Sequence, residues 1–374
     1  MMIRIRKIIH RLIYPVLLLL FLPTGGMAQR ESLIHGKVVD RKTGDPIHFA
    51  NVFLSNTTLG SATSPDGTFE IAQISLGSYQ LVIHHIGYET EIVNVDLLTE
   101  KKLDLVIPLN PRILSGEPVE VVARREKSWN KHLRSFREGL FGKTQNARHC
   151  EIHNPEVLNF REYEGWLYAE TDSLLHLTNR ALGYRIELIL ESFRCTPDEK
   201  KYQIHPVFHP MEPAGEGELI RWKKQRLKTY KGSFRHLLAS VYHQSLDSEG
   251  LELYEVKHVG NKIYTWGSTD RVKDISSLVR TSDFPDLMET GFRGHYMVLS
   301  PYIPRKTDRF IEEAQQTGFY QLEFYEPCFF SRNRDSALID TRGNIHTPNA
   351  FSISGYWAVY GVADMLPFSY QPDP

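Results

Sequence analysis

The chain has 374 residues, 41% hydrophobic and 24% charged, which is the balance of a globular protein with room for two or three domains. Its 44 basic and 45 acidic residues nearly cancel, so the composition argues against a nucleic-acid-binding protein, which needs a concentrated basic surface.

Residues 1–28 have the pattern of a secretory signal peptide. Four basic residues lie between positions 4 and 11, an apolar run follows at 16–22, and small residues at 26–28 suit cleavage. We therefore expect an exported protein of the periplasm or one associated with the outer membrane. No later stretch approaches the ~20 apolar residues of a membrane helix, so no transmembrane span is expected in the mature chain.

Residues 34–89 show short strand patterns separated by turn residues. Residues 34–40 and 47–54 carry β-branched and aromatic residues around the turn Thr43-Gly44-Asp45-Pro46. A third strand through 61–64 enters the turn Pro65-Asp66-Gly67, where glycine can adopt a positive φ. Strand patterns follow at 68–71, 79–83 and 103–107. Short strands at this spacing predict a small antiparallel β-sandwich.

The same stretch resembles a known family. The pattern G-x-V-x-D-x-x-T-G-x-P-I-x-x-A-N-V begins at Gly36, and a Pro-Asp-Gly-x-Phe turn, G-x-Y-x-L and I-G-Y-E follow it. These motifs resemble the carboxypeptidase regulatory-like domain over residues 33–109. The resemblance implies a transthyretin-like β-sandwich, and it concerns an accessory domain rather than a peptidase.

Residues 110–123 are predicted to be a linker, because prolines and glycine interrupt them too often for regular structure. Within it, residues 119–123 are similar to the segment that joins such a sandwich to the plug of TonB-dependent outer-membrane receptors. The remaining chain is too short for a transport barrel of that family. An outer-membrane receptor or another envelope protein is therefore a candidate partner.

Residues 124–374 alternate helical and strand patterns, which predicts an α+β domain. Apolar residues at i, i+4, i+7 and i+11 from Trp129 indicate a helix that ends near Gly142. A helix pair is expected at 219–230 and after Gly232, with Ser233 as the N-cap of the second helix. Further strands are predicted at 165–169, 183–190, 251–256, 296–299, 320–325 and 337–344.

The expected fold is therefore mainly β with α+β: an N-terminal transthyretin-like antiparallel β-sandwich followed by an α+β domain of uncharacterised type. Residues 179–184, 230–237, 355–357 and 363–367 also resemble segments of exported bacterial proteins that carry the regulatory-like domain. This second resemblance implies no activity.

The three cysteines are Cys150, Cys195 and Cys328. In an oxidising compartment they allow one disulfide with one free thiol, and the sequence does not indicate which pair. Three buried free thiols are the alternative. Their spacing does not resemble a zinc site.

Two residues fit the spacing of a zinc carboxypeptidase. His153 and Glu156 form an H-x-x-E pattern, which with a later histidine would suit a metal-dependent hydrolase. With 16 histidines in the chain a chance match is expected, and Pro155 favours a turn here. We therefore predict no catalytic residue and no cofactor, and keep the zinc-dependent peptidase as the alternative.

A group of arginines and aromatic residues on the predicted helix pair is a candidate binding surface, since these residue types dominate binding hot spots. The alternative is a solvated helix face whose two aromatic residues point to the core. The group consists of Arg221, Trp222, Arg226, Tyr230 and Arg235.

The signal peptide, the accessory-type sandwich and the lack of a convincing catalytic set favour one function. We expect a non-catalytic, exported binding or assembly protein at the periplasmic or outer-membrane surface. Two alternatives stay open: the zinc hydrolase, and an accessory partner of a TonB-dependent receptor.

Overall fold

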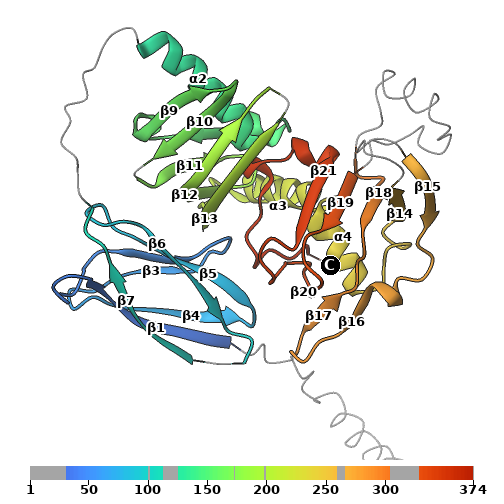
Figure 1. Ribbon diagram of the computed structural model, residues 1–374, viewed down its shortest axis with the longest axis horizontal. Helices are drawn as coiled ribbons and strands as arrows, with labels where there is room; N and C mark the ends of the chain where they lie inside the picture. The colour runs from blue at the N-terminus through green and yellow to red at the C-terminus, as the bar shows by residue number, and fades with distance from the viewer. Residues whose placement is uncertain are drawn as a thin grey trace, which may run out of the picture.

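The computed structural model describes residues 31–99, 102–112, 125–171, 173–197, 199–258, 266–303 and 328–373. Figure 1 shows a β-sandwich, a sheet with helix α2 along it, and a C-terminal group of strands around a further helix. Most sheet pairings are antiparallel, and the helices lie in the middle of the chain. The expected mainly β fold with α+β character is confirmed.

The sandwich is built from two facing sheets. One has the order β4–β1–β7 and the other the order β3–β2–β5–β6. β1 pairs in parallel with β7, so the sandwich departs from a purely antiparallel one at this position. The strands are β1 (Glu31–Asp40), β2 (Asn51–Leu54), β3 (Gly60–Ala62), β4 (Thr68–Ser75), β5 (Ser78–His84), β6 (Glu91–Asp96) and β7 (Lys102–Leu109).

Alternation along these strands places one apolar face inward. Ile34 and Val38 of β1 are buried together with Leu81 and Ile83 of β5, and they form the sandwich core. The predicted strand over 47–54 is shorter in the structure, because the backbone of Phe49 takes a φ of 56°, outside the region of extended strands.

The second body is a sheet covered on one side by helix α2 (Arg125–Phe141). Phe136 and Leu140 of α2 are fully buried against the sheet, and Gly142 follows the helix with a φ of 85°. This confirms the helix predicted from Trp129. The sheet, called the β8–β13 sheet below, has the order β8–β11–β12–β10–β9 with β13 on the other edge of β12. Its strands are β8 (Cys150–Ile152), β9 (Leu158–Tyr163), β10 (Trp166–Thr171), β11 (Leu175–Asn179), β12 (Tyr184–Cys195) and β13 (Lys200–Pro210).

The C-terminal body packs two sheets around helix α4 (Phe234–Tyr242), which follows α3 (Glu216–Tyr230). The Oγ of Ser233 accepts a hydrogen bond from the backbone N–H of His236 (3.1 Å), so the predicted N-cap is confirmed. One sheet joins β15 (Trp266–Arg271), β14 (Glu252–His258), β18 (His295–Leu299), β19 (Cys328–Arg332) and β21 (Phe351–Gly355); the other joins β16 (Val279–Thr281), β17 (Leu287–Thr290) and β20 (Ala337–Asp340). Short 3-10 turns are η2 (Asn146–His149), η3 (Pro155–Val157), η4 (Ser276–Leu278), η6 (Tyr356–Val359) and η7 (Val362–Asp364).

Within residues 124–374, the described part of the chain contains two large, separate hydrophobic cores and a smaller cluster around Met297 and Leu299. The first lies between α2 and the β8–β13 sheet, and the second lies between α4 and the C-terminal strands. The sequence patterns predict a single α+β domain over residues 124–374. The domain boundaries themselves stay predictions.

The sandwich packs against the outward side of the β8–β13 sheet. An apolar contact joins Phe53 and Val82 of the sandwich to Ile189 and Val207 of the sheet. The backbone N–H of Asn56 donates to the carbonyl of Pro206 at 2.7 Å, so main-chain hydrogen bonds also cross this junction.

Three predictions fall on residues outside the described ranges: the signal peptide at 1–28, most of the linker at 110–123, and the strand at 320–325. In the part of the chain that the structure describes, no helix has the length and apolar character to cross a membrane.

Candidate functional site

The outward face of the β8–β13 sheet is covered by the sandwich at one end and exposed at the other. In β10, Leu167 and Ala169 point toward α2 and are buried. Trp166, Tyr168 and Glu170 alternate with them and therefore lie on the outward face.

Strand register places cations beside these aromatic rings. Tyr168 pairs with Arg161 of β9 on one side and with Arg194 of β12 on the other, and Arg194 in turn pairs with Lys201 of β13. Because directly opposite residues share a face, a row of side chains runs across four strands. Tyr163, which is 60% exposed, lies opposite Trp166 at the end of the hairpin.

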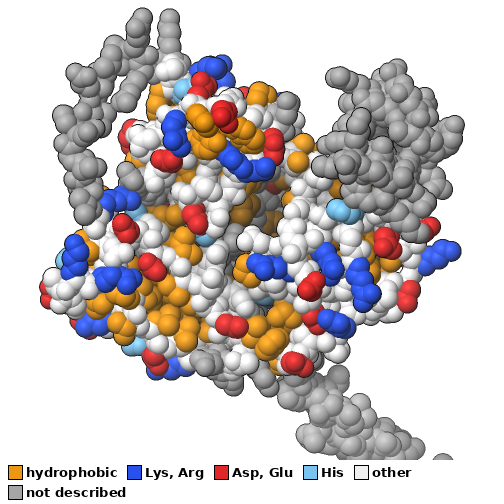
Figure 2. All heavy atoms as spheres, viewed as in Figure 1, with side chains coloured by type: hydrophobic (Ala, Val, Ile, Leu, Met, Phe, Trp, Pro, Cys, Tyr) orange, Lys and Arg blue, Asp and Glu red, His pale blue; other side chains and the backbone are white. Residues whose placement is uncertain are grey.

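The cations lie over the rings. The Arg161 guanidinium carbon is 5.3 Å from the Tyr168 ring centroid, and that of Arg194 is 4.9 Å from the Trp166 centroid. The Nζ of Lys201 lies 5.7 Å from the same Trp166 ring. Such contacts stabilise the cation and fix its orientation. We call the set Arg161, Tyr163, Trp166, Tyr168, Arg194 and Lys201 the aromatic–cationic face. In Figure 2, hydrophobic and Lys or Arg side chains gather over β9 and β10.

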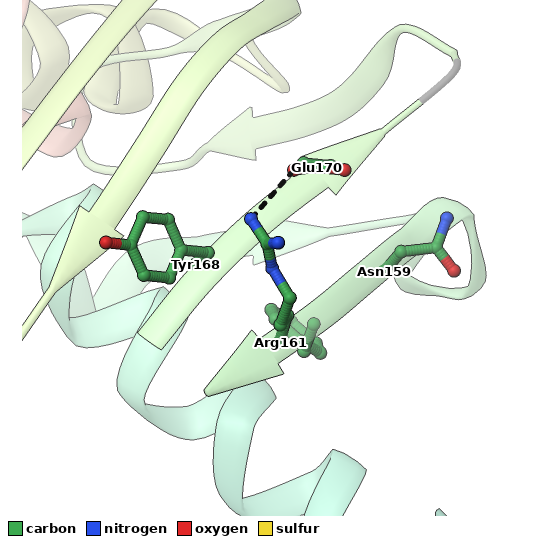
Figure 3. Close-up of a pocket in the computed structure, with 5 residues that line it drawn as sticks. Asn159, Arg161, Tyr168 and Glu170 are labelled. Atoms are coloured by element: carbon green, nitrogen blue, oxygen red, sulfur yellow. Dashed lines mark ion pairs between the residues drawn. The ribbon is translucent and has the colours of Figure 1, made fainter. Parts of the chain in front are cut away.

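A shallow hollow of about 200 Å³ lies on this face (Figure 3), lined by Asn159, Phe160, Arg161, Tyr168 and Glu170. Arg161 extends from β9 toward Glu170, with Nη2 at 3.9 Å from Oε1. Both side chains are largely exposed, so this ion pair is loose and contributes little to stability.

This arrangement can bind a carboxylate. A guanidinium stacked on a ring keeps its in-plane N–H groups free to donate, and carboxylates match their geometry. Since the Arg161–Glu170 pair is long and solvated, a ligand carboxylate can replace Glu170 at small cost.

A second hollow of about 210 Å³ lies at the junction between sandwich and sheet, and its lining includes His84, Thr90, Arg112 and Glu191. A hydrogen bond of 3.0 Å joins Nδ1 of His84 to Oγ1 of Thr90, and burial lowers the pKa of His84 to about 4. These side chains are engaged at the domain junction, so we regard this hollow as structural.

The residues of the zinc hypothesis lie in a turn at the sheet edge. Both side chains are exposed, and Nε2 of His153 is hydrogen-bonded to Oγ1 of Thr178 at 2.6 Å. Glu156 lies in the 3-10 turn η3. Among the described residues, no group of three or more His, Cys, Asp or Glu side chains is placed to hold a metal ion. The pair therefore has no third ligand within these ranges.

The predicted binding group on the helix pair makes mostly internal contacts. Trp222 and Tyr230 are buried, and the Nε of Arg226 donates to the Leu182 carbonyl at 2.7 Å. Arg235 donates to backbone carbonyls of the C-terminal segment. Arg221 is largely exposed, at 3.6 Å from Glu218. A binding role for this group stays a prediction.

The three cysteines are buried, and none of them forms a disulfide. Cys150 and Cys195 belong to the core under α2, whereas Cys328 belongs to the C-terminal core. Burial raises the pKa of the Cys150 thiol to about 12, which keeps it protonated and unreactive. Of the two alternatives left open by the sequence, the structure has the one with three buried thiols and no disulfide.

Sequence reasoning missed the aromatic–cationic face. Alternation in residues 158–171 could have placed Arg161 with Tyr163, and Trp166 with Tyr168, on common faces. The partners Arg194 and Lys201 depend on strand register, for which the sequence carries no local signal.

Comparisons with known proteins bear on the sandwich. The profile of the CarboxypepD_reg-like domain matches residues 34–121. No curated protein matches the chain.

Several solved structures match parts of the chain. A type II cohesin–X-dockerin complex from Acetivibrio cellulolyticus is 24% identical over 21% of this chain and 56% of its own, with a TM-score of 0.19. A DUF3823 family protein from Bacteroides ovatus is 9% identical over 49% of this chain and 82% of its own, with a TM-score of 0.19. A protein from Bacteroides uniformis provisionally described as carbohydrate-binding is 8% identical over 48% and 79%, again with a TM-score of 0.19. This chain thus spans little more than half of the first of them, and such TM-scores carry no functional assignment.

Proposed function

We propose that this chain, whose residues 34–121 match the CarboxypepD_reg-like domain, is a non-catalytic, exported binding protein of the periplasm or outer-membrane surface. It binds carboxylate-bearing ligands on the aromatic–cationic face. The observation that carries this proposal is the pair of arginines on this face, the exposed Arg161 and the half-buried Arg194, each stacked on an aromatic ring of β10.

Three features support this assignment. The stacked rings orient the guanidinium groups before a ligand arrives, so less side-chain entropy is lost on binding. Tyr163 and Trp166 extend the surface along the hairpin and offer apolar contact area beside the cations. The opposite face of the same sheet is packed against α2, which holds the strands rigid.

Calorimetric titration of the mature chain tests the proposal. We expect binding of oligogalacturonate, poly-glutamate peptide or both, and no binding of a neutral oligosaccharide of equal length. The two acidic probes distinguish a glycan carboxylate from a peptide carboxylate. Arg161→Gln with Arg194→Gln should weaken binding by roughly tenfold or more, since a charge-assisted hydrogen bond contributes about 1.5–3 kcal/mol.

The matched control is Lys42→Gln with Arg334→Gln, which removes the same charge from exposed sites elsewhere. An equal loss of affinity in both double variants would show that binding depends only on the net charge of the protein. Failure of both acidic probes to bind would refute the proposal.

The exported location and an envelope partner belong to the same proposal. Cell fractionation should place the protein in the periplasm or with the outer membrane, and co-purification would identify a TonB-dependent receptor or another envelope partner. Metal analysis tests the zinc-hydrolase alternative, which requires stoichiometric zinc that His153→Ala removes.

A further inference from the structure

Helix α3 has a buried side that fixes its orientation. Trp222 and Tyr230 are 4% and 5% exposed, and Nε1 of Trp222 donates to the Arg180 carbonyl at 2.9 Å. Arg226 lies on the same side, with its guanidinium carbon 4.2 Å from the Tyr184 ring centroid. In Figure 1 the helix lies between the β8–β13 sheet and the C-terminal strands.

The opposite side of α3 exposes aliphatic residues. Ile220 is 57% exposed and Leu227 39%, and they lie two helical turns apart on one line. Leu219, which is 37% exposed, lies about 100° around the helix from Ile220 and is not part of this line. In a helix with a packed inner side, such a second apolar stripe contributes nothing to the core.

Cations flank the stripe on both sides. At 100° per residue, Lys223 projects on one side of the Ile220–Leu227 line, and Lys224 and Lys228 project on the other. All three are exposed. Arg221 adds a further charge at the edge.

Among the described residues, Glu249 and Asp340 lie near the buried Tyr230 at the end of α3, whereas the carboxylates beside its exposed side are those of its first turn and Asp373. Glu218 lies 3.6 Å from Arg221, Glu216 precedes the stripe, and Asp373 lies 3.1 Å from Lys223. Residues 219–230 contain no carboxylate, so the stripe from Ile220 to Leu227 lies in a positive field.

We propose that the exposed side of α3 docks on the surface of an anionic phospholipid bilayer. The aliphatic stripe enters the headgroup region, while Lys223, Lys224 and Lys228 contact lipid phosphates. The stripe is too small for the core of a stable protein–protein interface. It also has flexible lysines around aliphatic residues, rather than the Trp, Tyr and Arg that dominate protein hot spots.

Co-sedimentation of the mature chain with vesicles tests docking. We expect binding to phosphatidylethanolamine vesicles containing phosphatidylglycerol, weakened by salt, and little binding to phosphatidylcholine alone. Lys224→Gln with Lys228→Gln should weaken binding by an order of magnitude or more, because each lysine near an anionic surface contributes about fivefold. The control Lys42→Gln with Lys273→Gln removes equal charge from exposed loops and should bind like the parent.

A fluorescent label locates the contact independently of charge. Since the native cysteines are buried, an environment-sensitive dye on Ile220→Cys labels one site selectively. Its emission should shift to the blue on adding anionic vesicles, and a dye on Lys42→Cys should not shift. Absence of vesicle binding, or binding that ignores the lysine variant and the Ile220 label, would overturn the proposal. Arg161→Gln with Arg194→Gln should leave vesicle binding unchanged, so this proposal and the proposed function can fail separately.

Discussion

At the scale of single residues, two buried histidines are held neutral. Nδ1 of His236 accepts a hydrogen bond from the Gly232 N–H at 3.1 Å, and Nε2 lies 3.2 Å from the Glu249 carboxylate. Burial is the largest cause of the lowered pKa of His236, which is about 4, and the positive charge of Lys231 is the next largest. For His84, burial again comes first, and Arg112 adds to it.

These two histidines predict a pH-dependent stability. Both folded pKa values lie below the ordinary 6.5, so between pH 6.5 and pH 4 the unfolded chain binds more protons than the folded one. The free energy of unfolding should therefore fall as the pH drops through this window, by roughly 1–2 kcal/mol per histidine at pH 5. Urea unfolding at pH 7.5 and at pH 5 measures this fall in the free energy of unfolding.

The variant His84→Gln isolates one contribution, because glutamine keeps a donor for Thr90 without titrating. Its stability should change less between the two pH values than that of the parent. An equal change in both proteins would contradict the assignment, given that His85, His176 and Glu187 also surround His84.

Ser233 and His236 are three residues apart, a pair that resembles a catalytic nucleophile and its base, and the lowered pKa belongs to this histidine. The Ser233 Oγ accepts the backbone N–H of His236, and the His236 ring is engaged by Gly232 and Glu249. The ring therefore holds the loop before α4 and has no nitrogen aimed at the serine oxygen.

At the scale of elements, the cap of α4 gives a simple prediction. Ser233→Ala removes the acceptor for the first turn and should lower the free energy of unfolding by about 1 kcal/mol. Ser233→Asp keeps an acceptor and should restore most of the loss. Denaturant titration of the parent and the two variants measures their free energies of unfolding. If Ser233→Asp is destabilised as much as Ser233→Ala, the serine does not act as an N-cap.

Helices were more predictable than strands in this chain. Apolar spacing from Trp129 and the turn Gly232-Ser233 predicted α2 and α4, because a helix repeats its signal over several turns. Strands β11, β13 and β19 were not predicted, since each is short or lacks clean alternation. Residues 205–208 of β13 are buried on both sides of the strand. This stretch therefore lacks the alternation of polar and apolar residues by which a half-buried strand is recognised.

The candidate site was also only partly predictable from the sequence. The sequence pointed to arginines on α3 and α4, but most of them make internal contacts. Arg161 and Arg194 are 33 positions apart in sequence, and only the pairing of β9, β10 and β12 places both beside Tyr168.

At the scale of the whole molecule, a C-terminal segment joins the three bodies. Arg235 of α4 donates to the carbonyls of Arg342 (3.1 Å), Pro367 (2.9 Å), Phe368 (3.0 Å) and Tyr370 (2.5 Å). The Phe368 N–H donates to the Asn56 carbonyl at 2.8 Å, and its ring packs on the sandwich core.

Arg235→Ala should therefore loosen the whole assembly. It removes the donor to four carbonyls of buried and half-buried residues. Those of Pro367 and Phe368 keep another donor, the Tyr370 N–H and Asn344 Nδ2, and the other two lose the donor that Arg235 supplies, which predicts a loss of roughly 2–4 kcal/mol. Denaturant unfolding measures the loss, and limited proteolysis should cut the segment after Pro367 sooner. The matched control is Arg221→Ala, which removes an exposed arginine and should change stability by less than about 0.5 kcal/mol. Equal stability of the two variants would exclude this role for Arg235.

The sequence by itself determined the sandwich, because turns such as Pro65-Asp66-Gly67 and the alternation of β1 and β5 are local signals that neighbouring residues reinforce. It also determined the helices that carry a periodic apolar side. The tertiary structure alone decided which surfaces remain exposed: register aligned Arg161 and Arg194 on one face, and the burial of Trp222 turned Ile220 and Leu227 outward. Both depend on contacts between residues distant in the chain, for which no local pattern exists.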